Sequence, residues 1–269
     1  MLNTFTPKEM AMLQDNYRFT TKVNISNLSA QVSHLLNEDQ LYLYLSSVKE
    51  QTKAANLSVA ASLFVKRYSF AVLIALYSMS VLSKRINFSI NNVSIQTLKE
   101  SDLLWLPSIH FRDITLYPAL QEDRNNWRND IVNNIFANHI DILFNQLNTI
   151  SKLPKRTMWE NLYTYIVWMY KNLLQDRNHL DNHYLIKEDF NMITYGSEGY
   201  LFGTYEQNPF LEFRDSQDCS DILEGNSQKR KTCCLSYLTK SKGDFCKNCP
   251  ISVKKSKINK YPRLSSTTV

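Results

Sequence analysis

The sequence predicts a mainly α-helical protein with a small antiparallel β-sheet, an α+β architecture, followed by a short C-terminal segment of different composition. Long stretches carry apolar residues every three or four positions, which is the period of a helix that packs on one side. Only one region alternates apolar and polar residues as half-buried strands do. With 269 residues, 43% of them hydrophobic, the chain is long enough to bury a large core.

Four long helices are expected from this periodicity. They cover Asp39–Thr52, Asn56–Leu82, Trp127–Ile150 and Thr157–Leu174. The uncharged apolar stretch from Tyr68 to Leu82 has 15 residues, whereas a membrane-spanning helix needs roughly 20. We therefore expect this helix to be buried in the protein. Three tryptophans on the later helices are expected to fill the core: Trp127, Trp159 and Trp168.

The strand candidates lie between the second and third of these helices. The stretch INFSINNVSIQT, residues 86–97, alternates on both sides of Asn91 and Asn92 and predicts a hairpin with a two-residue turn. The stretch PSIHFRDITLYPA, residues 107–119, gives one or two further strands. The glycine-containing stretch GSEGYLFG, residues 196–203, matches neither a dinucleotide fingerprint nor a P-loop, so no nucleotide site is expected.

The distribution of charge divides the chain near Glu224. Residues 225–269 hold eleven Lys or Arg and one acid, a net charge of +10, whereas residues 1–224 carry −4. We therefore expect a helical body, residues 1–224, and a basic C-terminal segment, residues 225–269. The first residues lack the pattern of a secretory signal. The expectation is a cytoplasmic protein, with at most peripheral contact to the inner face of the cell membrane.

Four of the five cysteines lie in the basic segment: Cys233, Cys234, Cys246 and Cys249. In a reducing compartment, clustered cysteines more often hold a metal or carry out redox chemistry than form disulfides. Cys246 and Cys249 form a C-x-x-C turn, which brings two thiolates to one metal site. Cys233 and Cys234 are adjacent, and neighbouring side chains of an extended chain point apart. This pairing suits a two-metal cluster better than a single zinc ion.

The stretch TCCLSYLTKSKGDFCKNCP, residues 232–250, resembles the C-terminal signature of the FhuF-like ferric siderophore reductases. That signature has paired cysteines, a tyrosine three residues later and a closing C-x-x-C-P, matched here by Cys233, Cys234, Tyr237, Cys246, Cys249 and Pro250. Eleven residues separate Cys234 from Cys246, where ten are expected in the family; one more residue in an exposed loop costs little closure entropy. Residues 58–80 and 158–170 are similar to two helices of the family. Cys219 lies outside the signature and is expected to be a free thiol.

The resemblance implies a [2Fe-2S] cluster bound by the four cysteines of the signature, and the activity of a ferric siderophore reductase. One-electron reduction of Fe(III) to the softer Fe(II) weakens the hold of hard oxygen ligands, so iron is released from the chelate. Because no nucleotide site is expected, the electron must come from a separate ferredoxin- or flavoprotein-type donor. The substrate is expected to be an anionic ferric siderophore.

Basic side chains near such a cluster are expected to favour its reduced, more negative form and to steer anionic partners towards it. The alternative is that these residues form only a solvated surface. The residues concerned are Lys66, Arg67, Lys229, Arg230, Lys231, Lys240, Lys242 and Lys247. Lys66 and Arg67 belong to the helix that is similar to a helix of the family, and this similarity suggests that they face a siderophore pocket. A basic pair on a helix more often faces solvent, and this is the favoured alternative.

Two other functions remain open from the sequence. The basic segment would also suit a zinc-stabilised module that engages nucleic acid through phosphates. No nucleic-acid reading motif appears in it, so nucleic acid is not the expected partner. A siderophore-binding or biosynthetic relative without redox function would fit the helical body, but this function leaves the four cysteines unexplained.

Overall fold

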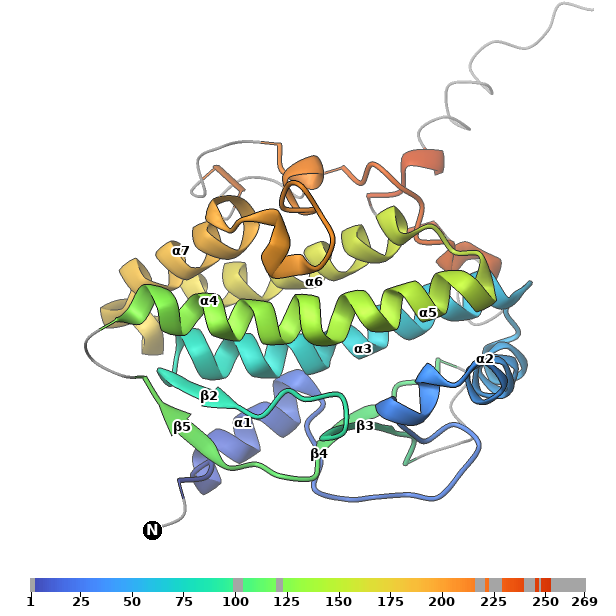
Figure 1. The fold of residues 1–269 in the computed structure, drawn as a ribbon, viewed down its shortest axis with the longest axis horizontal. Helices are drawn as coiled ribbons and strands as arrows, with labels where there is room; N and C mark the ends of the chain where they lie inside the picture. Colours follow the sequence, from blue (N-terminus) through green and yellow to red (C-terminus); the bar gives the residue numbers. More distant parts are fainter. Residues whose placement is uncertain are drawn as a thin grey trace, which may run out of the picture.

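The computed structural model describes residues 3–98, 104–119, 123–215, 221–222, 229–239, 245–246 and 248–252. Helices dominate these residues and two small antiparallel sheets lie beside them, so the predicted fold class is confirmed (Figure 1). The helices are α1 (Pro7–Tyr17), α2 (Glu38–Thr52), α3 (Leu57–Ser80), α4 (Arg124–Ile135), α5 (Ile142–Ser151), α6 (Lys155–Gln175) and α7 (His183–Asn191). The strands are β1 (Ala30–Gln31), β2 (Lys84–Ile86), β3 (Val93–Gln96), β4 (Ser108–Phe111) and β5 (Leu116–Pro118).

Helix α3 forms the centre of the body, with α4, α5 and α6 on one side and the strands on the other (Figure 1). Its start is fixed by Asn56, whose side chain accepts a hydrogen bond from the backbone N–H of Val59 at 3.1 Å. The helix is long and apolar enough to cross a membrane, yet 89% of its most apolar window is buried inside the protein. The prediction of a buried helix over this stretch is therefore confirmed.

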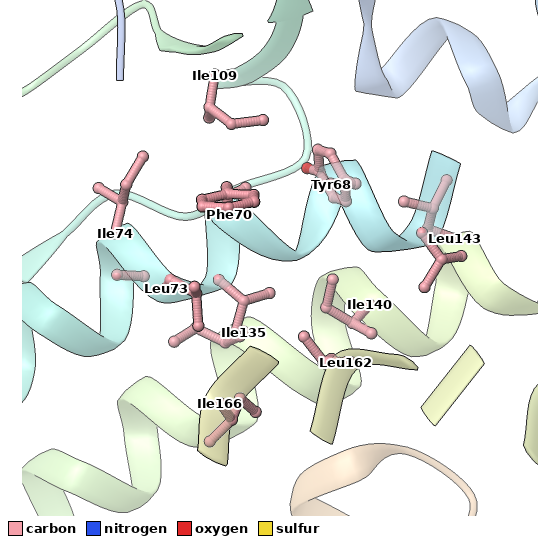
Figure 2. Close-up of a cluster of buried hydrophobic side chains, with 14 of the residues drawn as sticks. Tyr68, Phe70, Leu73, Ile74, Ile109, Ile135, Ile140, Leu143, Leu162 and Ile166 are labelled. Carbon is pink, nitrogen blue, oxygen red and sulfur yellow. The ribbon is translucent and has the colours of Figure 1, made fainter. Parts of the chain in front are cut away.

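The side chains of α3 pack in two directions (Figure 2). Phe70 and Ile74 lie towards Ile109 of β4, while Leu73 lies towards Ile135 of α4. All of these residues are buried. Truncating one such side chain to alanine typically costs about 2–5 kcal/mol, so this packing fixes α3 relative to both layers.

The predicted helix over residues 127–150 is present as α4 and α5, joined without a break by one wide turn, the π-helix Phe136–Asp141. His139 of this turn is buried; its Nδ1 lies 2.8 Å from the carbonyl oxygen of Phe88, and its Nε2 lies 2.7 Å from the Tyr68 hydroxyl. Because a carbonyl only accepts, Nδ1 carries the proton and Nε2 accepts from Tyr68. The wide turn thus ties the helices to α3.

The predicted hairpin over residues 86–97 is wrong. β2 pairs with β5, whereas β3 lies between β1 and β4 in the three-stranded sheet. Asn92, expected at the tip of a tight turn, is buried instead and exchanges hydrogen bonds of 2.8 Å with the backbone of Asp113. These bonds hold the chain between the two sheets: within the alternating stretch, Ile86 ends β2 and Val93 begins β3.

The tryptophan prediction holds for two of the three residues. Trp127 and Trp159 are buried, but Trp168 on α6 is 42% exposed. Trp168 packs edge-on against Tyr17 and Phe70 at ring-centroid distances of 6.3 and 6.2 Å. Helices α1 and α7 were not predicted, because each is short and has few apolar positions from which to read a helical period.

Candidate metal centre

We call the described residues 229–239, 245–246 and 248–252 the cysteine segment. It lies against the N-terminal parts of α3 and α6 (orange to red in Figure 1). Backbone contacts also attach it to the link between α2 and α3. The N–H of Ala55 donates to the carbonyl oxygen of Leu238 at 3.1 Å, and Ala54 forms an antiparallel bridge with Thr239. The segment therefore packs on two helices of the body and on the link between α2 and α3.

Glu160 of α6 is buried and accepts hydrogen bonds from the chain just before the paired cysteines. The backbone N–H of Thr232 donates to it at 2.7 Å, and the Thr232 hydroxyl and the Lys231 backbone N–H donate as well. The Arg230 guanidinium lies 3.5 Å from the same carboxylate and donates to the Asn161 side-chain oxygen at 2.6 Å. A buried carboxylate needs such partners, because an unpaired charge in the interior is costly.

Two further residues of the body hold the backbone of Cys234. The Ser62 hydroxyl of α3 donates to the carbonyl oxygen of Cys234 at 2.7 Å, and the Asn161 side-chain amide donates to that hydroxyl at 3.0 Å. Ser62 and Asn161 are both buried. Helices α3 and α6 therefore fix the position of Cys234 together.

Lys66, one turn after Ser62 on α3, reaches the same cysteine with its side chain. Its ammonium nitrogen lies 3.9 Å from the Cys234 Sγ and donates to the Ser236 hydroxyl at 2.7 Å. Burial alone would raise the pKa of the Cys234 thiol, but the Lys66 charge and hydrogen bonds from Ser236 lower it to about 7. This environment favours the thiolate, which is the form that binds metal.

The second cysteine pair is held by a local turn. The N–H of Cys249 donates to the carbonyl oxygen of Cys246 at 3.0 Å, and the Ser252 hydroxyl donates to the carbonyl oxygen of Cys249 at 2.9 Å. One backbone bond joins this turn to the first pair, from the N–H of Arg230 to the carbonyl oxygen of Asn248 at 3.2 Å.

The two cysteine pairs approach each other in space. Each close contact between thiols joins one cysteine of the first pair to one cysteine of the second pair. The Cys234 and Cys246 sulfurs are 3.9 Å apart, and the thiol of Cys233 contacts that of Cys249. Burial and the neighbouring thiols raise the pKa of Cys233 and of Cys246 to about 11. Among the residues that the structure describes, no three His, Cys, Asp or Glu side chains are grouped to hold one metal ion. Cys233 and Cys246 each interact with two of the other thiols, so all four thiols are close neighbours.

The other predicted basic residues differ in their positions. Arg67 donates to the backbone oxygens of Trp105 and Leu104 at 3.2 and 3.3 Å, away from the cysteines. Lys231 contacts the Glu212 carbonyl oxygen at 2.7 Å and the Asp215 carboxylate at 3.6 Å. Lys229 is exposed. Four predicted residues, and the boundary at 224–225, lie outside the described residues: Lys240, Lys242, Lys247 and Cys219.

Residues 230–250 match the family model of the FhuF 2Fe-2S C-terminal domain. The segment is therefore similar to an iron–sulfur domain. The FhuF C-terminal domain contains all four clustered cysteines, and its cofactor is a [2Fe-2S] cluster, as the sequence predicted. No curated protein and no solved structure shows significant similarity to the chain. The resemblance of residues 58–80 and 158–170 to helices of the family therefore stays a prediction.

Ser62, Glu160 and Asn161 were not identified from the sequence. We call them, together with Lys66, the body anchors. Ser62 and Lys66 are one turn apart on α3, but nothing in a single sequence shows that their side of the helix faces the cysteines rather than the core. A buried Glu within a mainly apolar helix was the one available signal, because carboxylates are rarely buried without a partner.

Proposed function

We propose that the protein is a ferric siderophore reductase. In this proposal Cys233, Cys234, Cys246 and Cys249 bind the [2Fe-2S] cluster of the FhuF C-terminal domain. When bound, the cluster supplies one electron to Fe(III) in the chelate and is itself oxidised. The Fe(II) that results is held less tightly by oxygen ligands and leaves the chelate. The observation that supports the proposal best is the gathering of four thiols, one of them beside the half-buried cation of Lys66.

Lys66 has a defined role in this proposal. A cluster with four thiolates gains negative charge on reduction, so a nearby cation favours the reduced form and raises the potential. The Lys66 ammonium lies 3.9 Å from the Cys234 sulfur, and the residue is half-buried. Its field at the cysteine is therefore screened less by salt than that of a surface lysine.

The electron reaches the protein from a separate donor in this proposal, because the sequence contains no nucleotide-binding loop. A ferredoxin- or flavoprotein-type protein supplies one electron for each turnover. The basic residues of the C-terminal segment favour an acidic docking surface on that donor.

The proposal is tested in two stages on anaerobically purified protein. Metal and sulfide analysis should first find two irons and two acid-labile sulfides per chain; one zinc and no sulfide would contradict the ligand assignment. The protein is then reduced chemically and mixed with a ferric siderophore. The absorption of the oxidised cluster should return as a chromogenic Fe(II) chelator traps one Fe(II) per cluster. A reduced cluster that ferric chelates do not reoxidise would instead favour a non-redox role.

A further inference from the structure

The chain turns sharply directly after the paired cysteines. Leu235 adopts the left-handed backbone conformation, with φ 59° and ψ 3°. This conformation is unfavourable for a residue with a Cβ, and it persists only where the surrounding contacts hold it. The turn places the Ser236 hydroxyl oxygen 3.3 Å from the Cys234 Sγ and directs the Leu235 N–H to the Cys233 Sγ at 3.4 Å. Each of the two adjacent sulfurs therefore has a hydrogen-bonding group of the turn beside it.

Lys66 fixes the direction of the hydrogen bond at Ser236. An ammonium group has donors only, so at 2.7 Å Lys66 donates to the Ser236 hydroxyl oxygen. The hydroxyl has one proton of its own, and that proton cannot point at an ammonium group. Within the described residues, the acceptor that the proton reaches is the Cys234 Sγ. When Cys234 is a metal-bound thiolate, which only accepts, the order is therefore Lys66 to Ser236 to Cys234.

The surroundings keep this chain of two hydrogen bonds in place. Ser236 is buried, so water has little access to its hydroxyl. Its carbonyl oxygen accepts a hydrogen bond from the Thr239 hydroxyl at 2.9 Å, which holds the turn. Hydrogen bonds in a chain polarise one another, and a cation at the start strengthens the bond at the end. Cys233, by contrast, receives its bond from a neutral backbone amide.

The path through Ser236 is also shorter than the direct one. The Lys66 nitrogen lies 3.9 Å from the Cys234 Sγ, which is long for a hydrogen bond, whereas the two steps through the hydroxyl measure 2.7 and 3.3 Å. Hydrogen bonds to the cysteine sulfurs are among the features that set the potential of an iron–sulfur cluster. They strengthen when reduction adds negative charge, so they favour the reduced form.

We propose that Ser236 is a positioning residue that relays the Lys66 charge to the Cys234 sulfur and so raises the reduction potential of the cluster bound there. The inference goes beyond the proposed function, because it concerns the cofactor and holds for any acceptor of the electron. None of the measurements below involves a ferric chelate, so their outcome does not depend on reductase activity.

The first test is a spectroelectrochemical titration of the anaerobically purified, cluster-loaded protein. Ser236→Ala should shift the one-electron equilibrium roughly threefold to tenfold towards the oxidised form, which lowers the midpoint by about 30–60 mV. Ser236→Thr keeps a hydroxyl and should restore most of the potential. Thr239→Val is the matched control, because it removes a buried hydroxyl that donates to a backbone oxygen, and it should keep the wild-type potential. Equal potentials for Ser236→Ala and wild type would overturn the proposal.

A double-mutant cycle separates a relay from two independent effects. Lys66→Met removes the cation and frees the Ser236 hydroxyl to rotate. In that background, Ser236→Ala should change the potential much less than it does in the wild type. If the shifts of the two single variants simply add in the double variant, the charge and the hydroxyl act separately and the relay is wrong.

Electron–nuclear double resonance of the reduced protein detects the proton itself. Comparison of samples in H₂O and D₂O should show an exchangeable proton coupled to the cluster in wild type and in Ser236→Thr. This signal should be absent in Ser236→Ala. If Ser236→Ala does not hold the cluster, Lys66→Met carries the test, and its signal should be weaker than that of wild type. A proton spectrum identical to wild type in the variant that carries the test would overturn the proposal.

Discussion

Cys233 and Cys234 owe their positions to the helical body, whereas Cys246 and Cys249 are held by their own turn. The body anchors reach the first pair through a buried carboxylate, a hydroxyl and an ammonium group. A backbone hydrogen bond from the N–H of Arg230 to the carbonyl oxygen of Asn248 links the second pair to the first. The C-x-x-C turn is therefore held by contacts within the turn, whereas the adjacent pair is held by tertiary contacts with the helical body.

The difference explains how adjacent cysteines can serve one cofactor. Neighbouring side chains of an extended chain diverge, so their sulfurs need an outside constraint to converge on one site. Hydrogen bonds from α3 and α6 to residues 230–236 supply that constraint. A C-x-x-C turn needs no such help, because its own backbone curvature brings the two sulfurs together.

The largest effect is expected from removing a thiol of the body-held pair. Cys234→Ser should abolish the [2Fe-2S] cluster, because a neutral hydroxyl is a poor substitute for a thiolate ligand. Visible absorption and electron paramagnetic resonance of the anaerobically purified variant measure this. Cys219→Ser is the matched control and should keep both spectra. A normal spectrum for Cys234→Ser would refute its role as a ligand.

Glu160→Gln tests the contribution of the body to the first pair. The change leaves the Arg230 guanidinium, whose side chain is only 7% exposed, without its buried counter-charge. Breaking such a pair typically costs about 4 kcal/mol, and the loss should appear as a lower urea midpoint for cluster release.

The same substitution at Glu212 provides the control. Glu212 and its ion-pair partner Arg156 are about half exposed, so Glu212→Gln should cost less than about 1 kcal/mol. Equal midpoints for the two variants would mean that the body does not hold the first pair.

Acid should destabilise the body through the buried His139. Burial lowers the pKa of His139 from 6.5 to about 4. Between these values the unfolded chain binds the proton and the folded protein does not, so stability falls as the pH drops through this window. The loss from His139 alone is about 3 kcal/mol between pH 7 and 4. In urea titrations, His139→Gln should show a correspondingly smaller loss; equal losses would contradict a neutral buried imidazole.

The smallest expected effect is a shift in the midpoint potential of the cluster, and it should differ between two adjacent cations on α3. Lys66→Gln removes the charge beside Cys234 and should lower the midpoint potential by about 60 mV, a tenfold change in the one-electron equilibrium. Arg67→Gln removes one charge from the next residue, which faces Trp105, and should shift the potential far less. Spectroelectrochemical titration measures both.

The contribution of surface charges to the midpoint potential can be separated from that of Lys66 by varying the salt concentration. Neutralising Lys240, Lys242 and Lys247 together should lower the potential by an amount that shrinks at high ionic strength, whereas the effect of Lys66→Gln should persist. If Lys66→Gln and Arg67→Gln had the same potential as wild type, the tuning charge would lie elsewhere.

The sequence predicted the parts of the site that depend on local spacing. The four cysteines were recognised because residue type and separation along the chain are enough to indicate a metal site. Glu160 and Ser62 were missed, because they meet residues 232 and 234 only after α3 and α6 pack together. For Lys66 the sequence left a position facing a siderophore pocket and a position facing solvent open, and its contact with Cys234 was not foreseen.

For the fold, long stretches with a periodic apolar pattern predicted the secondary structure correctly, whereas short stretches did not. The buried helix α3 extends over 24 residues, and an apolar pattern of this length with a helical period fits no other secondary structure. The alternation over residues 86–97 was equally regular, but buried hydrogen bonds between Asn92 and Asp113 separate its two strands. Strand pairing depends on partners distant in sequence, which a local pattern does not contain.

The attachment of residues 235–239 to the body has a consequence for how the family can vary in length. Ser236 is bonded to Lys66, and the next residues, Leu238 and Thr239, are paired with the chain after α2. An insertion between Cys234 and Thr239 would break these contacts. We therefore expect a change in length between the two cysteine pairs to be tolerated only after Thr239.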